Sequence, residues 1–230
     1  MIKYGEKIRV SYEADDKYYS TGITHKFVYR LHQTLAVTGP HRHASGLVLT
    51  LWAEKMLRTR VDIVQPLSHP RQKVLTSEMF LYITQSLEEG VETYTANYGE
   101  SNVPLKPEDI ALLNSHLDCS MKDTHNASHE HPTRALTHQL VYLQPSEMLL
   151  VFCMTDYRVW CAVHWTATNL LLFNCQPHGR LTGESTYQHG GLMYHITKCP
   201  RVIAETLNMI AEDTGSLQSI DHIMVLKQGQ

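Results

Sequence analysis

The sequence predicts an α+β protein that forms a single domain over residues 1–230. Several segments place apolar residues at helical spacing, and other short apolar runs are bounded by turn residues, as is typical of strands. These helices and strands do not alternate regularly, and two neighbouring strand candidates are close enough to form a hairpin, which favours the α+β class. No repeat and no low-complexity linker divides the chain.

In the first half of the chain, helical spacing of apolar residues predicts helices over His25–Val37, Gln72–Glu89 and Lys106–Leu117. The third of these has Pro107 in its first turn, where proline is favoured. Leu47–Leu57 is dense in Leu, Val, Thr and Trp and predicts a strand.

In the second half we expect, in order, a polar loop, the two strands of a hairpin, a helix, a short strand and a helix. These are the loop 118–133, the hairpin strands Leu136–Leu143 and Met148–Met154, the helix Trp165–Phe173, the strand Leu192–Thr197 and the helix Arg201–Asp213. The hairpin connection is Gln-Pro-Ser-Glu, which is rich in turn residues.

Composition narrows the classes of function. With 20 basic and 23 acidic residues the net charge is −3, so a strongly basic nucleic-acid surface is absent, although small local basic sites remain possible. No apolar run approaches the roughly 18 residues of a membrane helix, and the N-terminus lacks a signal-peptide core. No two of the five cysteines form a CxxC motif, and we expect them to be free thiols. We expect a cytoplasmic protein without a membrane partner.

The 15 histidines raise the question of a metal site. His125, His129, His131 and His138 are close in sequence, and zinc needs three or four converging ligands. The segment also holds Asn, Ser and Pro, as is typical of a solvated loop. We therefore predict no metal site.

Three His-x-Thr triplets begin at His32, His164 and His195. Two such triplets that face each other would allow one histidine to deprotonate a nucleophile and the other to protonate a leaving group. A two-histidine phosphodiesterase is therefore one alternative function, although triplets this short also arise by chance.

Several segments, taken in order, resemble the thymidylate synthase family, which includes the phage deoxycytidylate hydroxymethylases. Arg42-His-Ala-Ser-Gly46 with the following LVLTLWAEKML resembles the family's phosphate loop and its next strand. KVLTSEMFLYI resembles the helix with the catalytic glutamate, and Asn97-Tyr-Gly99 resembles the Tyr-Gly that follows. Further similar segments are Gln139–Tyr142, CMTDYRVWCAVHWTATNLLLF and GLMYHITKCPRVIAETL, so that the resemblance covers most of the chain.

The resemblance implies a thymidylate-synthase fold, with a mixed sheet flanked by helices, and a homodimer that pairs through a sheet face. It places Glu78 on the catalytic glutamate and Tyr98 in the conserved Tyr-Gly, so these two residues are the catalytic candidates. Glu78 would relay protons or would only cap a loop, and both interpretations stay open. The candidate substrate-binding residues are Arg42 and Gln139 in matched segments, Thr166 at the position of the family's pyrimidine-reading Asn, and Lys122, Arg134, Arg158 and Arg201, which are new or displaced positive charges around the same inferred cleft.

One departure from the family changes the expected chemistry. The family's nucleophilic cysteine stands five residues before the glutamine, and that position is Arg134 in this sequence. A guanidinium cannot replace a thiolate in the attack on C6 of a pyrimidine. Cys199 is the only plausible substitute. We therefore expect the Cys-dependent methyl or hydroxymethyl transfer to be lost, and with it a clear role for tetrahydrofolate, so the cofactor stays unknown.

The principal functional hypothesis is a protein that binds a pyrimidine deoxynucleotide, or a modified base in DNA, in phage-type nucleotide modification. If it is active, it would be a transferase acting on pyrimidine nucleotides. A non-catalytic scaffold that binds a protein partner and the two-histidine phosphodiesterase are the alternatives.

Overall fold

A computed structural model places most of the chain. It describes residues 11–12, 26–30, 36–59, 64–66, 73–99, 101–123, 132–153, 157–178, 191–214, 217 and 219–229. None of the helices in these ranges is both long enough and apolar enough to cross a membrane.

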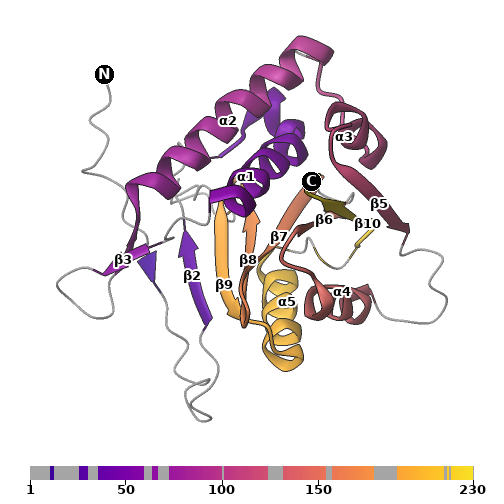
Figure 1. Cartoon of the computed structure of the whole chain (residues 1–230). Helices are drawn as coiled ribbons and strands as arrows, with labels where there is room; N and C mark the ends of the chain where they lie inside the picture. Colours follow the sequence, from indigo (N-terminus) through magenta and orange to yellow (C-terminus); the bar gives the residue numbers. More distant parts are fainter. Residues whose placement is uncertain are drawn as a thin grey trace.

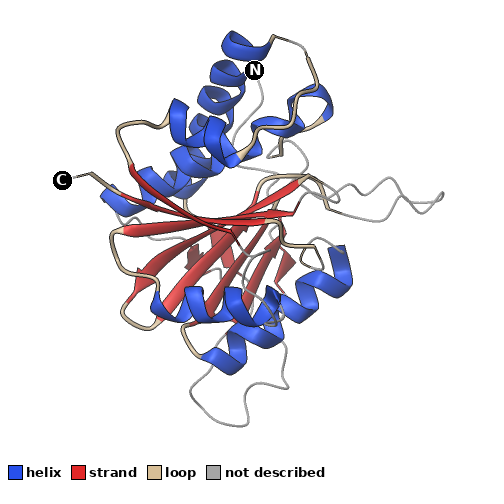
Figure 2. Ribbon diagram, turned by 90° about the vertical axis from the view of Figure 1, so that its right-hand side faces the viewer, coloured by secondary structure: helices blue, strands red, loops and turns tan. Residues whose placement is uncertain are grey.

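The architecture is a three-layer α+β arrangement, which confirms the predicted class (Figures 1 and 2). Its centre is a sheet in the order β1-β2-β9-β8-β7-β6-β10-β5. Every neighbouring pair of these strands is antiparallel, so the sheet is not mixed as expected. The strands are β1 (Ser11–Tyr12), β2 (Lys26–Arg30), β5 (Asp118–Asp123), β6 (Glu147–Cys153), β7 (Arg158–Thr166), β8 (Asn169–Asn174), β9 (Leu192–Thr197) and β10 (His222–Lys227).

Helices cover both faces of this sheet (Figure 2). The 3-10 helix η2 (Gly39–Ala44), α1 (Ser45–Thr59), α2 (Ser77–Tyr98) and α3 (Pro107–Leu113) lie on one side, and α4 (Pro132–Tyr142) and α5 (Pro200–Thr214) on the other. A separate two-stranded ribbon pairs β3 (Val64–Pro66) with β4 (Lys73–Leu75).

Strand β6 shows why two helical layers form. Met148 and Leu150 pack into the apolar cluster with α1, whereas Leu149 and Val151 pack into the cluster with α4 and α5. Alternate side chains of a strand point to opposite faces, so a strand that is apolar at every position must be covered on both sides. The same holds for β8.

Helix α1 occupies the segment Leu47–Leu57, where the prediction of a strand was wrong. Its buried residues include Leu49, Trp52 and Met56, and the Trp52 ring lies 4.9 Å from the ring of Phe173 in β8. The helix is enclosed by the sheet on one side and α2 on the other, so apolar residues surround most of its circumference. A helix buried in this way loses the amphipathic period by which it would be identified.

Two further predictions in the second half were wrong. Leu136–Leu143 falls in α4 and the residue that follows it, because Leu136, Leu140 and Leu143 are spaced to face the sheet together. The following Gln-Pro-Ser-Glu therefore joins a helix to β6 rather than two strands. Trp165–Phe173 contains the end of β7, a turn and most of β8, and its apolar density reflects burial on both faces.

The first half contains smaller corrections. Residues 26–30 of the predicted helix His25–Val37 form β2, and residues 31–35 lie outside the described part. Helix α2 begins at Ser77 rather than Gln72, because Thr76 caps it by accepting a hydrogen bond from the Met79 N–H. Residues 118–123 of the predicted polar loop form β5, an edge strand of the sheet.

Four predicted elements are confirmed: β6, which covers residues 148–153 of the predicted Met148–Met154, β9 over Leu192–Thr197, α3 within Lys106–Leu117 and α5 over Arg201–Asp213. For α3, Pro107 opens the helix, and the Asp109 carboxylate accepts a hydrogen bond from the Lys106 N–H at 2.9 Å. In each of these segments the apolar residues recur at a clear helical or strand spacing, or a recognisable residue marks where the element begins or ends.

Gly90 lies inside α2, where the crossing helix α1 leaves no room for a side chain. A Cβ at this position would lie 2.5 Å from Cγ2 of Val48 and 2.9 Å from the Val48 backbone nitrogen. A side chain can rotate away from such a contact, but a helix backbone cannot. The absence of a side chain at Gly90 therefore sets how closely α1 and α2 pack.

We predict that Gly90→Ala destabilises the protein by about 1–2 kcal/mol. The cost of overpacking exceeds the gain of about 1 kcal/mol that alanine normally gives a helix. Urea unfolding measures the change, with Glu92→Ala on the exposed side of α2 as the matched control. Equal or greater stability of Gly90→Ala would show that the two helices do not meet at this point.

Candidate functional site

A groove with a volume of about 670 Å³ lies between α4 and α5, on the side turned away from the sheet. Arg134, His138 and Tyr142 line it from α4, and Arg201 and Asn208 line it from α5. The three α4 residues are four positions apart, so successive turns of the helix present them on one face. The groove volume is in the usual range for a small-molecule site, about 300–1,000 Å³.

Lys198 fixes the end of this groove. Its Nζ donates a hydrogen bond to the carbonyl oxygen of Leu143 at 2.6 Å, which ties the end of α4 to the turn before α5. Burial lowers the pKa of Lys198, and Glu147 nearby opposes that shift. The same hydrogen bond brings the start of α5 close to Tyr142, the last residue of α4, and both helices line one groove.

The two aromatic side chains of the groove form a pair. The His138 and Tyr142 rings have centroids 4.6 Å apart with planes inclined by 51°. Tyr142 is 62% exposed, which is unusual for a large aromatic side chain in a folded domain. This ring pair is therefore available to stack on a flat ligand.

Arg201 stands at the groove end near Tyr142. Its Nε donates a hydrogen bond to Oε1 of Glu205 at 2.9 Å, one helical turn along α5. The Arg201 side chain is 81% exposed, and ion pairs of this kind contribute only about 0.3–0.5 kcal/mol to stability. The ion pair thus orients the guanidinium without removing it from solvent.

Two of the predicted substrate-binding residues, Arg134 and Arg201, therefore line the same groove. Gln139 is on α4 beside Arg134 but does not line the groove. Thr166 is the last residue of β7, next to the turn to β8, where its hydroxyl accepts a hydrogen bond from Nδ2 of Asn169 at 3.0 Å. Lys122 is on the edge strand β5, in register with Ile223 of β10.

Arg42 belongs to a second cluster, near the start of β7. It lies in η2 before a helix, not in a loop before a strand as the resemblance implies. Its Nε donates to Nε2 of His43 at 3.3 Å, and its Cζ is 5.8 Å from the centroid of the Tyr157 ring. The His43 ring also meets Tyr157, edge to face, at 5.2 Å.

Arg158 is close to this cluster in sequence but makes different contacts. One Nη of Arg158 lies 3.4 Å from Nε2 of His178, whose ring nitrogen also bonds Oδ1 of Asn174 at 2.7 Å. Arg158 and Thr166 occupy opposite ends of β7, about 27 Å apart at 3.4 Å per residue.

A buried amide joins the two parts of the second cluster. Nε2 of Gln176 donates to the carbonyl oxygens of Tyr157 at 2.6 Å and Arg42 at 3.5 Å. Tyr157 has a positive φ of 54°, which is rare for a side chain of its size. The sequence analysis missed this network, although polar residues that follow the apolar strand β8 directly were a usable signal.

The two predicted catalytic residues do not come together. Glu78 and Tyr98 lie at opposite ends of α2, about 30 Å apart at 1.5 Å per residue. Glu78 is exposed in the first turn, so it does not lie against the apolar face. Burial and the neighbouring Asp109 raise the pKa of Tyr98, whose ring stacks on Tyr94 at 5.4 Å.

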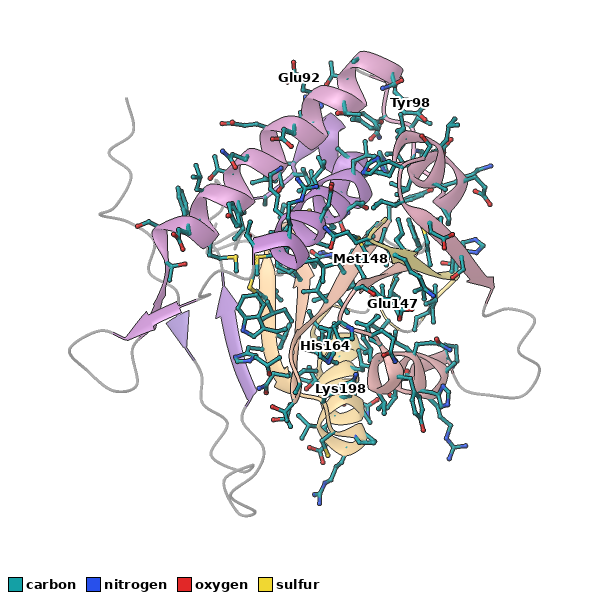
Figure 3. The ribbon with its side chains drawn as sticks, in the orientation of Figure 1. Glu92, Tyr98, Glu147, Met148, His164 and Lys198 are labelled. Atoms are coloured by element: carbon teal, nitrogen blue, oxygen red, sulfur yellow. The ribbon has the colours of Figure 1, made fainter. Side chains whose placement is uncertain are left out.

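The sheet separates both of these residues from the groove. Figure 3 shows Tyr98 at the upper end of the molecule, far from His164 and Lys198 below. The geometry therefore does not assemble the family's catalytic arrangement around Arg134.

The histidine triplets are also separated. His164 is in register with Leu170, and Leu170 with Ile196, both of which pack against α4 and α5. His195 is in register with Leu171, which packs on the other face with α1. Residues in register share a face, so His164 and His195 point to opposite sides of the sheet and cannot act on one phosphodiester. His32 lies outside the described residues.

The thiols do not form an activated nucleophile at the groove. Burial raises the pKa of Cys161 and Cys175, and it also raises the pKa of Cys119. Cys199, the expected substitute, is half-buried just before α5 and does not line the groove.

Metal ligands do not gather in the part of the chain that the structure covers. Within the described ranges, no group of three or more His, Cys, Asp and Glu side chains is placed to hold a metal ion. Of the histidines singled out for a metal site, His138 is in α4, and residues 124–131 lie outside the described part.

Comparison of the chain with protein families, with curated proteins and with solved structures finds no match. The resemblance to the thymidylate synthase family therefore rests on the sequence segments alone. The function has to be argued from the geometry of the groove.

His43 gives a testable pH dependence. Burial, and then the charge of Arg42, lower the pKa of this histidine below its ordinary 6.5. In the unfolded chain His43 binds a proton near pH 6.5, whereas in the folded chain it stays neutral to lower pH. Its contribution to stability is therefore complete above pH 6.5 and is lost as the pH falls towards the folded pKa.

We predict that His43→Gln loses less free energy of unfolding than the unmodified protein when the pH falls from 7.5 to 5.5. Urea unfolding at both pH values measures this difference, and His138→Gln on the exposed side of α4 is the matched control. An identical loss in His43→Gln and the unmodified protein would contradict the burial of a neutral imidazole at this position.

Proposed function

We propose that the groove between α4 and α5 binds a phosphate-bearing pyrimidine nucleotide. One observation carries this proposal: Arg134 and Arg201, from two separate helices, line one groove together with the His138–Tyr142 ring pair. The groove thus combines the two kinds of group that a nucleotide requires, a cation for the phosphate and an aromatic face for the base.

The chemistry of each group supports this assignment. A guanidinium binds a phosphate through two parallel N–H bonds, and this geometry is specific as well as strong. A base stacks on an exposed tyrosine or histidine ring with little loss of side-chain freedom. The pyrimidine class comes from the sequence resemblance, and a modified pyrimidine in DNA satisfies the same groups.

The proposal does not include the family's thiol-dependent transfer. Arg134 stands at the nucleophile position of the resemblance, and Glu78 and Tyr98 lie across the sheet from the groove. Tetrahydrofolate has no part in the proposal for the same reason. Binding without this transfer is the form of the thymidylate-synthase relationship that the groove supports.

The resemblance also implies a homodimer, and we retain that as a proposal with a different surface. The family pairs through a sheet face, but both faces of β6, β7 and β8 are covered by helices of the same chain. A dimer of this protein would therefore use a helical layer or the edge strand β5.

We predict that dUMP or dCMP binds in isothermal titration calorimetry, and that binding is weakened roughly tenfold or more by Arg134→Gln or by Arg201→Gln, whichever removes the guanidinium that holds the single phosphate. A hydrogen bond to a charged group contributes about 1.5–3 kcal/mol when its partner is removed, which corresponds to that factor. Arg58→Gln is the matched control, because Arg58 is an exposed arginine of α1 with its own i, i+4 ion pair.

Circular dichroism establishes that all three variants remain folded, as their exposure leads us to expect. Absence of binding at millimolar nucleotide, or equal affinity in the two groove variants and the control, would overturn the proposal. Of the two alternative functions, the non-catalytic scaffold that binds a protein partner would then remain.

A further inference from the structure

The groove is longer than one nucleotide contact requires. The Lys198–Leu143 hydrogen bond joins the end of α4 to the turn before α5, so Arg201 lies at the Tyr142 end of the groove, and Arg134, near the start of α4, lies toward the other end. Arg134 and Tyr142 are eight residues apart on α4, which corresponds to about 12 Å along the helix. The His138–Tyr142 ring pair lies between Arg134 and Arg201.

The positive charge is local. The whole chain carries a net charge of −3, so long-range attraction of a polyanion is weak. Among the described residues, acidic groups close to the helix ends that form the groove include Glu205, which pairs with Arg201, and Glu147, which lies 3.4 Å from Lys227 Nζ. Glu212 is exposed further along α5. Binding would therefore depend on two cations and one stacking surface.

The geometry points to a single-stranded nucleic acid as the occupant of this groove, with one base stacked on Tyr142 and different phosphates at Arg134 and Arg201. This inference rests on the proposed function, because it uses the same groups. It adds that the ligand continues through the groove from one arginine to the other. A strand carries one phosphate for each nucleotide, so it supplies the second phosphate that a nucleoside monophosphate lacks.

The test compares ligands of one and of several nucleotides by fluorescence anisotropy. Labelled dT12 is titrated with the full chain at several salt concentrations, and dTMP is used as competitor. We expect dT12 to bind more tightly than dTMP. Binding releases counterions from the strand, so the logarithm of the association constant falls with the logarithm of the salt concentration. The slope is about −0.7 for each neutralised phosphate of a single strand, so two phosphate contacts predict a slope near −1.4.

Variants assign the slope to the groove. Arg134→Gln and Arg201→Gln should each reduce the slope to about −0.7, while Arg58→Gln leaves it unchanged. Tyr142→Ala should weaken dT12 binding about tenfold without changing the slope, because stacking is sequence-tolerant and uncharged. Tyr142→Phe should restore the affinity, since it keeps the ring.

The possible outcomes separate this inference from the proposed function. If dTMP binds but dT12 binds no more tightly, the extended ligand is wrong and the mononucleotide site stands. If neither binds, both are wrong. An unchanged slope in both arginine variants, or equal binding of a polyglutamate peptide, would also overturn the inference. A parallel titration with U12 shows whether the strand is DNA or RNA.

Discussion

The structure depends on a sheet that is apolar on both faces. Strands β6 and β8 bury successive side chains, which point to opposite faces of the sheet, so neither face can remain in water. The chain covers one face with α1 and α2 and the other with α4 and α5, and two separate apolar clusters result. Each buried Leu, Phe or Met contributes about 1.5–3 kcal/mol, so loss of either helical layer would expose more apolar surface than the fold tolerates.

This constraint decides where chemistry is possible. Because the centre of the sheet has no open face, polar groups are confined to the ends of the strands and to the outer sides of the helices. The Arg42–His43–Tyr157 contacts near the start of β7 represent the first case, and the α4–α5 groove represents the second. Lys198 ties the end of α4 to the turn before α5 at one end of this groove.

Elements whose apolar residues recur at a clear spacing were predicted correctly from the sequence. The prediction was wrong where burial on several sides removes that spacing. Helix α5 was found because its apolar residues occupy one side only, and β9 because it is short and bounded. The sequence predicts a strand where α1 forms, because the sheet and α2 enclose this helix and its apolar residues lie on most sides. A single sequence cannot show from how many sides a segment will be covered.

The candidate site was predicted in part. The resemblance singled out Arg134 and Arg201, and the packing of α4 against α5 brings both to one groove. His138 and Tyr142 were missed as a pair, because their contact depends on α4 being a helix rather than the predicted strand. Glu78 and Tyr98 were predicted from motif order, which carries no information about their separation along α2.

Chemical-shift mapping of the ¹⁵N-labelled protein with dCMP tests the central claim most directly, because it locates the ligand without any substitution. The groove predicts that the shifted amides fall in α4 between Arg134 and Tyr142 and in the first turns of α5, with α2 unaffected. Shifts centred on Glu78, on Tyr98 or on the Arg42 cluster, or no shifts at saturating nucleotide, would contradict it.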